Sequence, residues 1–132
     1  MAVATCIQTP TRFQRRTIAD ATAVPIGTIM KLIDANTVVV SAANNDPFGG
    51  IAWEEKTASD GLTEMTCAMN GRWSCTSTAA AITAGGSVAI GGANAVRASV
   101  GSNDVVSGAQ LGSNRILNTL DAGGGTAIVE ID

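Results

Sequence analysis

The sequence predicts a mainly β protein, a small antiparallel barrel or sandwich, and three observations support this prediction. Short runs of valine, isoleucine, alanine and threonine recur along the chain. Turn signals separate these runs at intervals of about 8–12 residues, a spacing typical of small all-β domains. Glycine supplies 15 of the 132 residues and punctuates the runs. A chain of this length is expected to form one domain that buries roughly two-thirds of its unfolded surface.

Residues 1–24 differ from the rest and predict an extended N-terminal arm, which leaves 25–132 as the barrel-like domain. Pro10 interrupts an apolar, threonine-rich start, and Phe13 is an aromatic residue among polar neighbours. We expect this arm to become ordered on a partner; a frayed terminus is the alternative. The candidate contact residues of the arm are Arg12, Phe13, Gln14, Arg15, Arg16 and Ile18.

The first half of the domain is expected to contain three strands joined by polar turns. The strands are predicted over residues 26–33, 37–42 and from 51 onward. The middle strand is the clearest because it is rich in β-branched residues. Turn signals follow the strands at 34–36, 44–50 and 59–61. Aspartates in such turns bind nearby backbone amides, and we expect this of Asp34, Asp46, Asp60 and Asp104.

Residues 62–76 show the most regular pattern and predict a β-hairpin. Met65, Cys67 and Met69 alternate with other residues before Asn70-Gly71. Asn-Gly is the preferred pair for a two-residue hairpin turn because both positions need a positive φ. Trp73 and Cys75 alternate in the returning strand, so Trp73 is expected in the core.

The last third of the chain predicts one helical turn and several short strands. The helical turn is expected at 79–84 and a polar loop at 108–114. Strands are expected at 87–90, 96–100, 115–117 and 127–131. The last of these is the clearest because its apolar residues are mostly β-branched.

Composition argues against hydrolytic and metal-dependent enzymes. The chain has no histidine, which is the side chain most often used for proton transfer near neutral pH and the commonest metal ligand. Glu54 and Glu55 are adjacent, so in a strand they point to opposite faces and cannot share a proton. The glycine-rich segments lack phosphate-binding spacing. We therefore expect no catalytic residues, no metal site and no cofactor.

Three cysteines, Cys6, Cys67 and Cys75, show no zinc-site spacing and are expected as buried free thiols. A hairpin could bring Cys67 and Cys75 together, so a disulfide between them stays an alternative. The four aromatic residues are too dispersed in the sequence for a base-stacking or sugar-binding strip. Phe48 and Trp53 are the candidates for a subunit interface, with Trp53 equally expected in the core.

Charge is distributed unevenly and indicates an acidic partner surface. Residues 1–16 carry three arginines and no acidic residue, whereas 17–132 carry five basic and eleven acidic residues. A basic segment on an acidic body is expected to meet an acidic surface. Three arginines are too few for direct nucleic-acid binding. No apolar run predicts a membrane span or a signal peptide, so we expect synthesis in a cytoplasm.

The order of several short motifs resembles the capsid cement, or head decoration, proteins of tailed phages. These motifs are Pro25-Ile26-Gly27, Phe48 to Ala52, Glu54-Glu55-Lys56 before a turn at Gly61, Ile82 to Val88 as I-T-x-G-x-x-V, and a closing strand through Asp132. The resemblance covers most of residues 25–132.

This resemblance implies a β-tulip-like or barrel-like domain, often trimeric, on the outside of an icosahedral head. Its partners are then the major capsid protein and other copies of this chain, and its N-terminal arm lies along the capsid. The mean hydropathy of +0.25 with mostly small apolar side chains agrees with stabilisation by neighbouring subunits; a domain that stands alone is the alternative. A tail or fibre β-domain is the alternative function.

Overall fold

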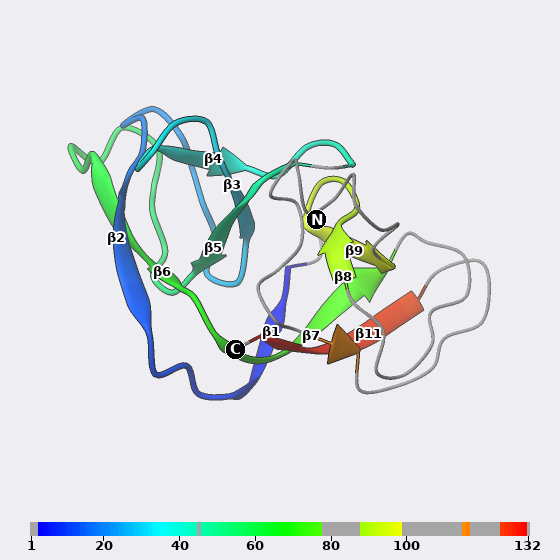
Figure 1. Cartoon of the computed structure of the whole chain (residues 1–132). Coiled ribbons are helices and arrows are strands. Elements are labelled where there is room, and N and C mark those ends of the chain that lie inside the picture. Colours follow the sequence, from blue (N-terminus) through cyan, green and yellow to red (C-terminus); the bar gives the residue numbers. More distant parts are fainter. Residues whose placement is uncertain (1–2, 45, 78–87, 99–114, 117–124, 132) are drawn as a thin grey trace.

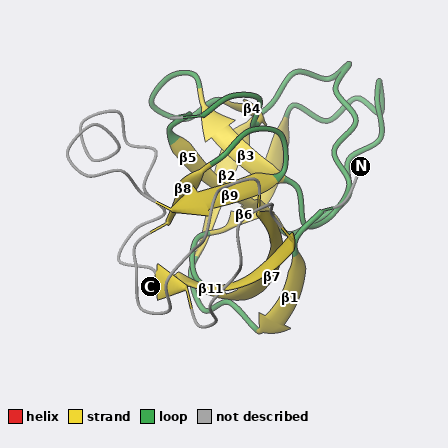
Figure 2. Ribbon diagram, turned by 90° about the vertical axis from the view of Figure 1, so that its right-hand side faces the viewer, coloured by secondary structure: helices red, strands yellow, loops and turns green. Residues whose placement is uncertain are grey.

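The computed structural model describes residues 3–44, 46–77, 88–98, 115–116 and 125–131. These residues are strands and loops, with no helix among them (Figure 2). The predicted mainly β class is therefore confirmed, although the described residues form two sheets and no closed barrel. The helical turn expected at 79–84 and the polar loop expected at 108–114 lie outside the described residues.

One sheet has six strands and occupies the right-hand part of Figure 1. Its main path runs β10-β11-β7-β9-β8, and β1 also pairs with β7. All of these pairs are antiparallel except β7 with β9. The strands are β1 (Thr5–Gln8), β7 (Gly71–Ser77), β8 (Val88–Ile90), β9 (Ala95–Ala98), β10 (Arg115–Ile116) and β11 (Gly125–Ile131).

The other sheet has five antiparallel strands in the order β2-β6-β5-β3-β4. The strands are β2 (Phe13–Thr17), β3 (Ile29–Leu32), β4 (Val38–Val40), β5 (Phe48–Ala52) and β6 (Glu64–Ala68). Its outermost strands approach each other at one isolated bridge, between Thr17 and Thr37. The sheet is thus strongly curved, and the bridge supports only one end of β2.

Two hydrophobic cores follow from this arrangement. The first includes residues of both sheets, among them Ile51, Ala68, Trp73 and Val129. The second gathers side chains of the five-stranded sheet and its loops, including Ile18, Met65 and Cys67. In β6, Cys67 and Ala68 are both buried although neighbours in a strand point to opposite faces. The five-stranded sheet therefore contributes one face to each core.

The turn aspartates behave as their sequence context predicts. The Asp34 carboxylate accepts hydrogen bonds from two amides of its own turn, at 2.9 and 2.8 Å. These bonds favour the charged carboxylate and lower its pKa. Asp46 and Asp60 also accept backbone amide hydrogen bonds. Asp104 lies outside the described residues.

The N-terminal segment is not seen as an extended arm. Its residues supply β1 and β2, which pair with β7 and β6 in the two different sheets. Ala4, Ile18 and Val24 are buried in the two cores, with exposed fractions of 5%, 1% and 0%. The sequence pattern did not predict that this segment forms strands of the folded body, because its partner strands lie about fifty residues or more away in the chain.

The predicted hairpin over residues 62–76 is wrong, although both of its strands exist. Instead of pairing with each other, β6 joins the five-stranded sheet and β7 joins the six-stranded sheet. Of the pair Asn70-Gly71, only Gly71 has a positive φ, at 109°, whereas a type I′ turn needs both. The segment therefore carries the chain from one sheet to the other. The predicted burial of Trp73 and Cys75 is confirmed.

Candidate protein-binding surface on strand β2

Strand β2 lies at the margin of the five-stranded sheet, at the far left of Figure 1. Phe13 is opposite Ala68, and Arg15 is opposite Thr66 of β6. The Trp53 amide in turn donates to the Thr66 carbonyl at 3.0 Å. Residues opposite each other in a ladder share a face, and residues two apart in a strand do as well. Phe13, Arg15 and Trp53 therefore belong to one face.

Three aromatic rings form a row that runs from the core to the surface. Trp73 is 2% exposed, and its indole Nε1–H donates to the Asn70 carbonyl at 3.1 Å. The Trp53 ring meets it edge-on, with centroids 6.1 Å apart and planes at 87°. Phe13 follows at 5.5 Å from Trp53 and is 44% exposed. The buried indole thus holds the outer two rings in place.

Charged side chains flank these rings. The Arg15 guanidinium contacts Glu54 at 3.2 Å and Glu64 at 3.5 Å, and it donates to the Thr66 hydroxyl at 3.0 Å. Glu54 also accepts the Thr66 amide at 2.9 Å. The Arg15 side chain is 57% exposed, so water screens both ion pairs and each contributes little to stability. We call Phe13, Arg15, Trp53, Glu54 and Glu64 the β2 surface.

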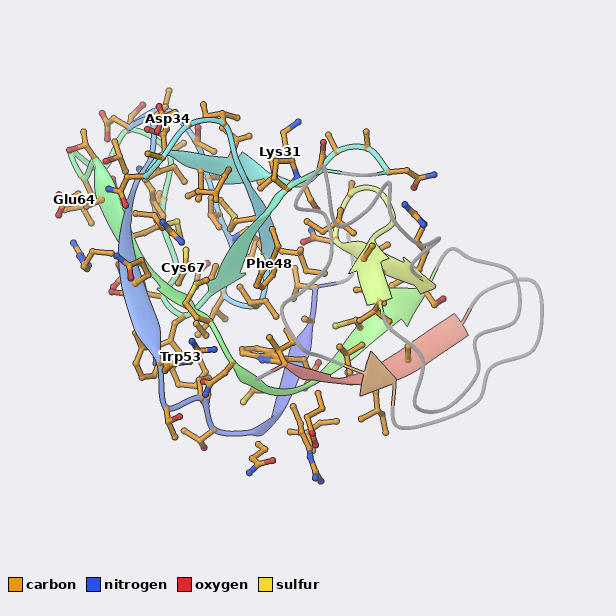
Figure 3. The ribbon with its side chains drawn as sticks, in the orientation of Figure 1. Lys31, Asp34, Phe48, Trp53, Glu64 and Cys67 are labelled. Atoms are coloured by element: carbon orange, nitrogen blue, oxygen red, sulfur yellow. The ribbon has the colours of Figure 1, made fainter. Side chains whose placement is uncertain are left out.

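The β2 surface extends along the outer part of the five-stranded sheet. Figure 3 shows Trp53 toward one end of β2 and Glu64 toward the other. An exposed aromatic ring beside arginine and carboxylate groups has the composition of a protein-contact surface, because aromatic and arginine side chains supply most binding hot spots.

The other predicted contact residues are placed differently. Arg16 is partly buried, and its Nε donates to the Gly49 carbonyl at 3.3 Å. Ile18 lies inside the second core and cannot meet a partner while the fold is intact. Gln14 is exposed, and so is Arg12, whose carbonyl accepts the Met69 amide. Of the six residues predicted for the arm, the structure thus leaves four on the surface.

The two predicted interface residues also differ in position. Trp53 is half-buried, between Phe13 and the core tryptophan. Phe48 is half-buried at the start of β5, opposite Lys31, and packs against the first core. The aromatic row was missed from sequence because its members are forty and twenty positions apart. The alternation of Phe13 and Arg15 was the available signal, and it is too short to show what lies beside it.

Asn70 anchors the segment that leads into β2. Its side-chain oxygen accepts the amides of Thr11 and Arg12 at 2.8 and 3.0 Å, and its amide group donates to the Thr11 hydroxyl at 2.8 Å. Gly71 lies so close to β1 that an added Cβ would stand 2.7 Å from a carbonyl oxygen. The Asn-Gly pair therefore joins three chain segments.

A polar notch of about 290 Å³ lies beside this anchor. Arg72 and Glu130 form an ion pair in it at 3.1 Å. The other residues that line the notch are Gln8, Thr9, Thr11, Asn70, Gly71 and Ile131. Arg72 and Glu130 are thus the two charged groups among the described residues that line the notch, and they are paired with each other.

The buried Lys56 ammonium group is held by ion pairs and hydrogen bonds within the fold, and the buried cysteine thiols stay protonated. The ammonium group of Lys56, a residue whose side chain is 1% exposed, contacts Asp60 at 2.8 Å and Asp20 at 3.7 Å, and it donates to two backbone carbonyls. The three cysteines are free thiols. Burial raises the pKa of Cys67 to about 11 and that of Cys75 to about 12, which keeps both protonated at neutral pH.

Two further observations concern the described residues alone. They contain no group of three or more histidine, cysteine, aspartate or glutamate side chains placed to hold a metal ion. They also contain no helix of the length and apolar character needed to cross a bilayer.

Comparison with protein-family models finds no match for this chain, and comparison with curated protein sequences finds none either.

Proposed function

We propose that this chain is a structural virion protein that binds the outside of a phage head and stabilises the major-capsid lattice. The β2 surface is the observation that carries the proposal. A half-exposed pair of aromatic rings, backed by a buried tryptophan, offers apolar contact area that is already ordered before binding. The order of motifs that resembles head decoration proteins supplies the identity of the partner.

Binding through a folded surface changes how the protein would dock. The sequence alone favours an arm that becomes ordered on the capsid, whereas the fold keeps β1 and β2 within its own sheets. Docking from the β2 surface avoids the entropy cost of ordering such an arm. Many equivalent sites on a shell make weak single contacts sufficient. A protein that binds only the expanded shell then stabilises that state by mass action.

Self-association belongs to the same proposal. Because Trp53 belongs to the β2 surface, Phe48 remains as the interface candidate, and a trimer formed through it would present several β2 surfaces to the shell together. The protein acts without catalysis or cofactor, on the exterior of the particle.

Binding to purified heads tests this function. We would add the purified chain to expanded heads that lack it and measure bound copies by co-sedimentation. Truncation of a hot-spot aromatic costs more than about 1 kcal/mol of binding. Phe13→Ala and Trp53→Ala should therefore weaken binding at least about fivefold.

Ile33→Ala is the matched control, because Ile33 is 58% exposed and lies in the turn between β3 and β4. It should bind like the unaltered chain. Failure of the unaltered chain to bind heads would refute the proposal. A low copy number in purified particles would favour the tail or fibre alternative.

A further inference from the structure

The outer edge of β2 presents backbone groups that the β2–β6 ladder does not use. The Met69 amide donates to the Arg12 carbonyl and the Ile18 amide donates to the Thr63 carbonyl, both at 2.9 Å. Even-numbered residues of β2 therefore direct their backbone groups toward β6. The Thr17 amide donates the other way, to the Asn36 carbonyl at 2.9 Å, as this alternation requires.

Phe13 and Arg15 therefore direct their N–H and C=O groups outward. Among the described residues no strand pairs with this edge, since β2 ends the sheet and the isolated bridge to Thr37 involves only Thr17. Two outward residues offer up to four hydrogen bonds to an added antiparallel strand. Both side chains are also exposed, by 44% for Phe13 and 57% for the Arg15 side chain.

Charge disfavours a second copy of the same strand on this edge. In an antiparallel pair centred on Gln14, Arg16 of each copy would lie opposite Arg12 of the other copy, which makes two Arg–Arg pairs. In a pair centred on Arg15, the two copies of Arg15 would oppose each other. Like charges directly opposite in a sheet are destabilising. In a pair centred on Phe13, each Arg15 would lie opposite Thr11 of the other copy. The Thr11 amide already donates to Asn70, so only the two Phe13 residues could exchange both backbone hydrogen bonds.

We propose that this edge accepts an extended segment of another protein, with an acidic side chain opposite Arg15 and an apolar side chain opposite Phe13. The inference deepens the proposed function and rests on it for the identity of the partner as a shell protein. The exposed Arg12 and Arg15, on β2 and its approach, supply the charge complementarity. The existing ion pairs of Arg15 are exposed, so sharing the guanidinium with an incoming carboxylate costs little.

Peptide binding to the full chain tests this inference without any capsid. The probe is the heptapeptide TTETVET with both ends blocked, which places a glutamate opposite Arg15 and a valine opposite Phe13. The comparison peptide TTKTVKT has lysines instead. Binding is followed by nuclear magnetic resonance, as shifts of the backbone amide signals.

We expect the glutamate peptide to shift the amide signals of Phe13 and Arg15 and to bind at least about tenfold more tightly than the lysine peptide. The absence of these shifts, or equal binding of the two peptides, would overturn the inference. Both results need only the unaltered chain.

Two variants at one position isolate the backbone contribution. Arg15→Ala removes the side chain and keeps the N–H, whereas Arg15→Pro removes both. Proline is tolerated there because the Arg15 N–H points away from β6. We expect Arg15→Pro to bind the glutamate peptide at least about fivefold more weakly than Arg15→Ala, as seen at the Phe13 amide. Equal binding would show that strand pairing is not involved.

Two further results separate this inference from the virion function. A dimer in sedimentation of the unaltered chain that Arg15→Pro abolishes would overturn the inference, because a second copy would then occupy the edge. Peptide binding without head binding would leave the inference standing and refute only the virion function. If Arg15→Pro and Arg15→Ala bind heads equally well, the β2 edge does not pair with the shell protein. That result would overturn this inference and leave the virion function standing.

Discussion

Replacing Ile18 by alanine distinguishes a folded N-terminal segment from a free arm. In the structure the Ile18 side chain is 1% exposed and lies in the second core with Met65 and Val24. The substitution removes three carbon groups, at about 0.8 kcal/mol each, which amounts to about 2.4 kcal/mol of transfer free energy. A residual cavity of about 50 Å³ adds about 1.2 kcal/mol. We therefore expect the free energy of unfolding to fall by about 3.6 kcal/mol.

Urea unfolding followed by tryptophan fluorescence measures this change. Trp73 is buried and should report the loss of the native state through a change in its emission. The transition midpoint should fall while the m-value stays the same, since the surface exposed on unfolding hardly changes.

Ile7→Ala is the matched control, because it makes the same substitution in the same segment at a side chain that is 53% exposed. We expect it to change the free energy of unfolding by less than about 0.5 kcal/mol. If Ile18→Ala has an effect as small as Ile7→Ala, residue 18 is not packed in a core and the placement of β2 is wrong.

Four further predictions concern other parts of the fold. Lys56→Met should lower the free energy of unfolding by about 2 kcal/mol in urea titrations, because the Asp20 and Thr57 carbonyls and the Asp60 carboxylate lose their donor; an unchanged midpoint would contradict this. Gly71→Ala should destabilise by more than 1 kcal/mol at about the same m-value, because φ is positive there and the space is filled; an alanine as stable as glycine would contradict it. Partial burial opposes ionisation of Asp46, but two amide hydrogen bonds and a nearby lysine outweigh it and lower its pKa. The group therefore stabilises the fold above pH 4, and this stability is lost as the pH falls through the folded pKa; Asp46→Asn should lose this part of the acid dependence in urea midpoints measured from pH 6 to pH 3. Cys67 and Cys75 should react with a thiol reagent at pH 8 only after unfolding, and rapid labelling of the native protein would refute their burial.

Local chemistry in the sequence was enough to predict the β class, most strands and several of the turns. Val38-Val39-Val40 and the alternation of Trp73 and Cys75 are patterns of period two or of β-branched residues, and such patterns act over a few neighbouring positions. The same holds for Asp34, which binds the amides of its own turn. These features need no knowledge of distant residues.

Only the tertiary structure decided which strands pair and which side chains meet. Asn70-Gly71 has the composition of a hairpin turn, but β6 and β7 join two different sheets. In those sheets their apolar side chains are buried in the two hydrophobic cores. Phe13 and Trp53 are forty positions apart, and their contact depends on the order β2-β6-β5. Strand order is set by the burial of whole faces, a sum over residues far apart in the chain, and no short segment carries that information.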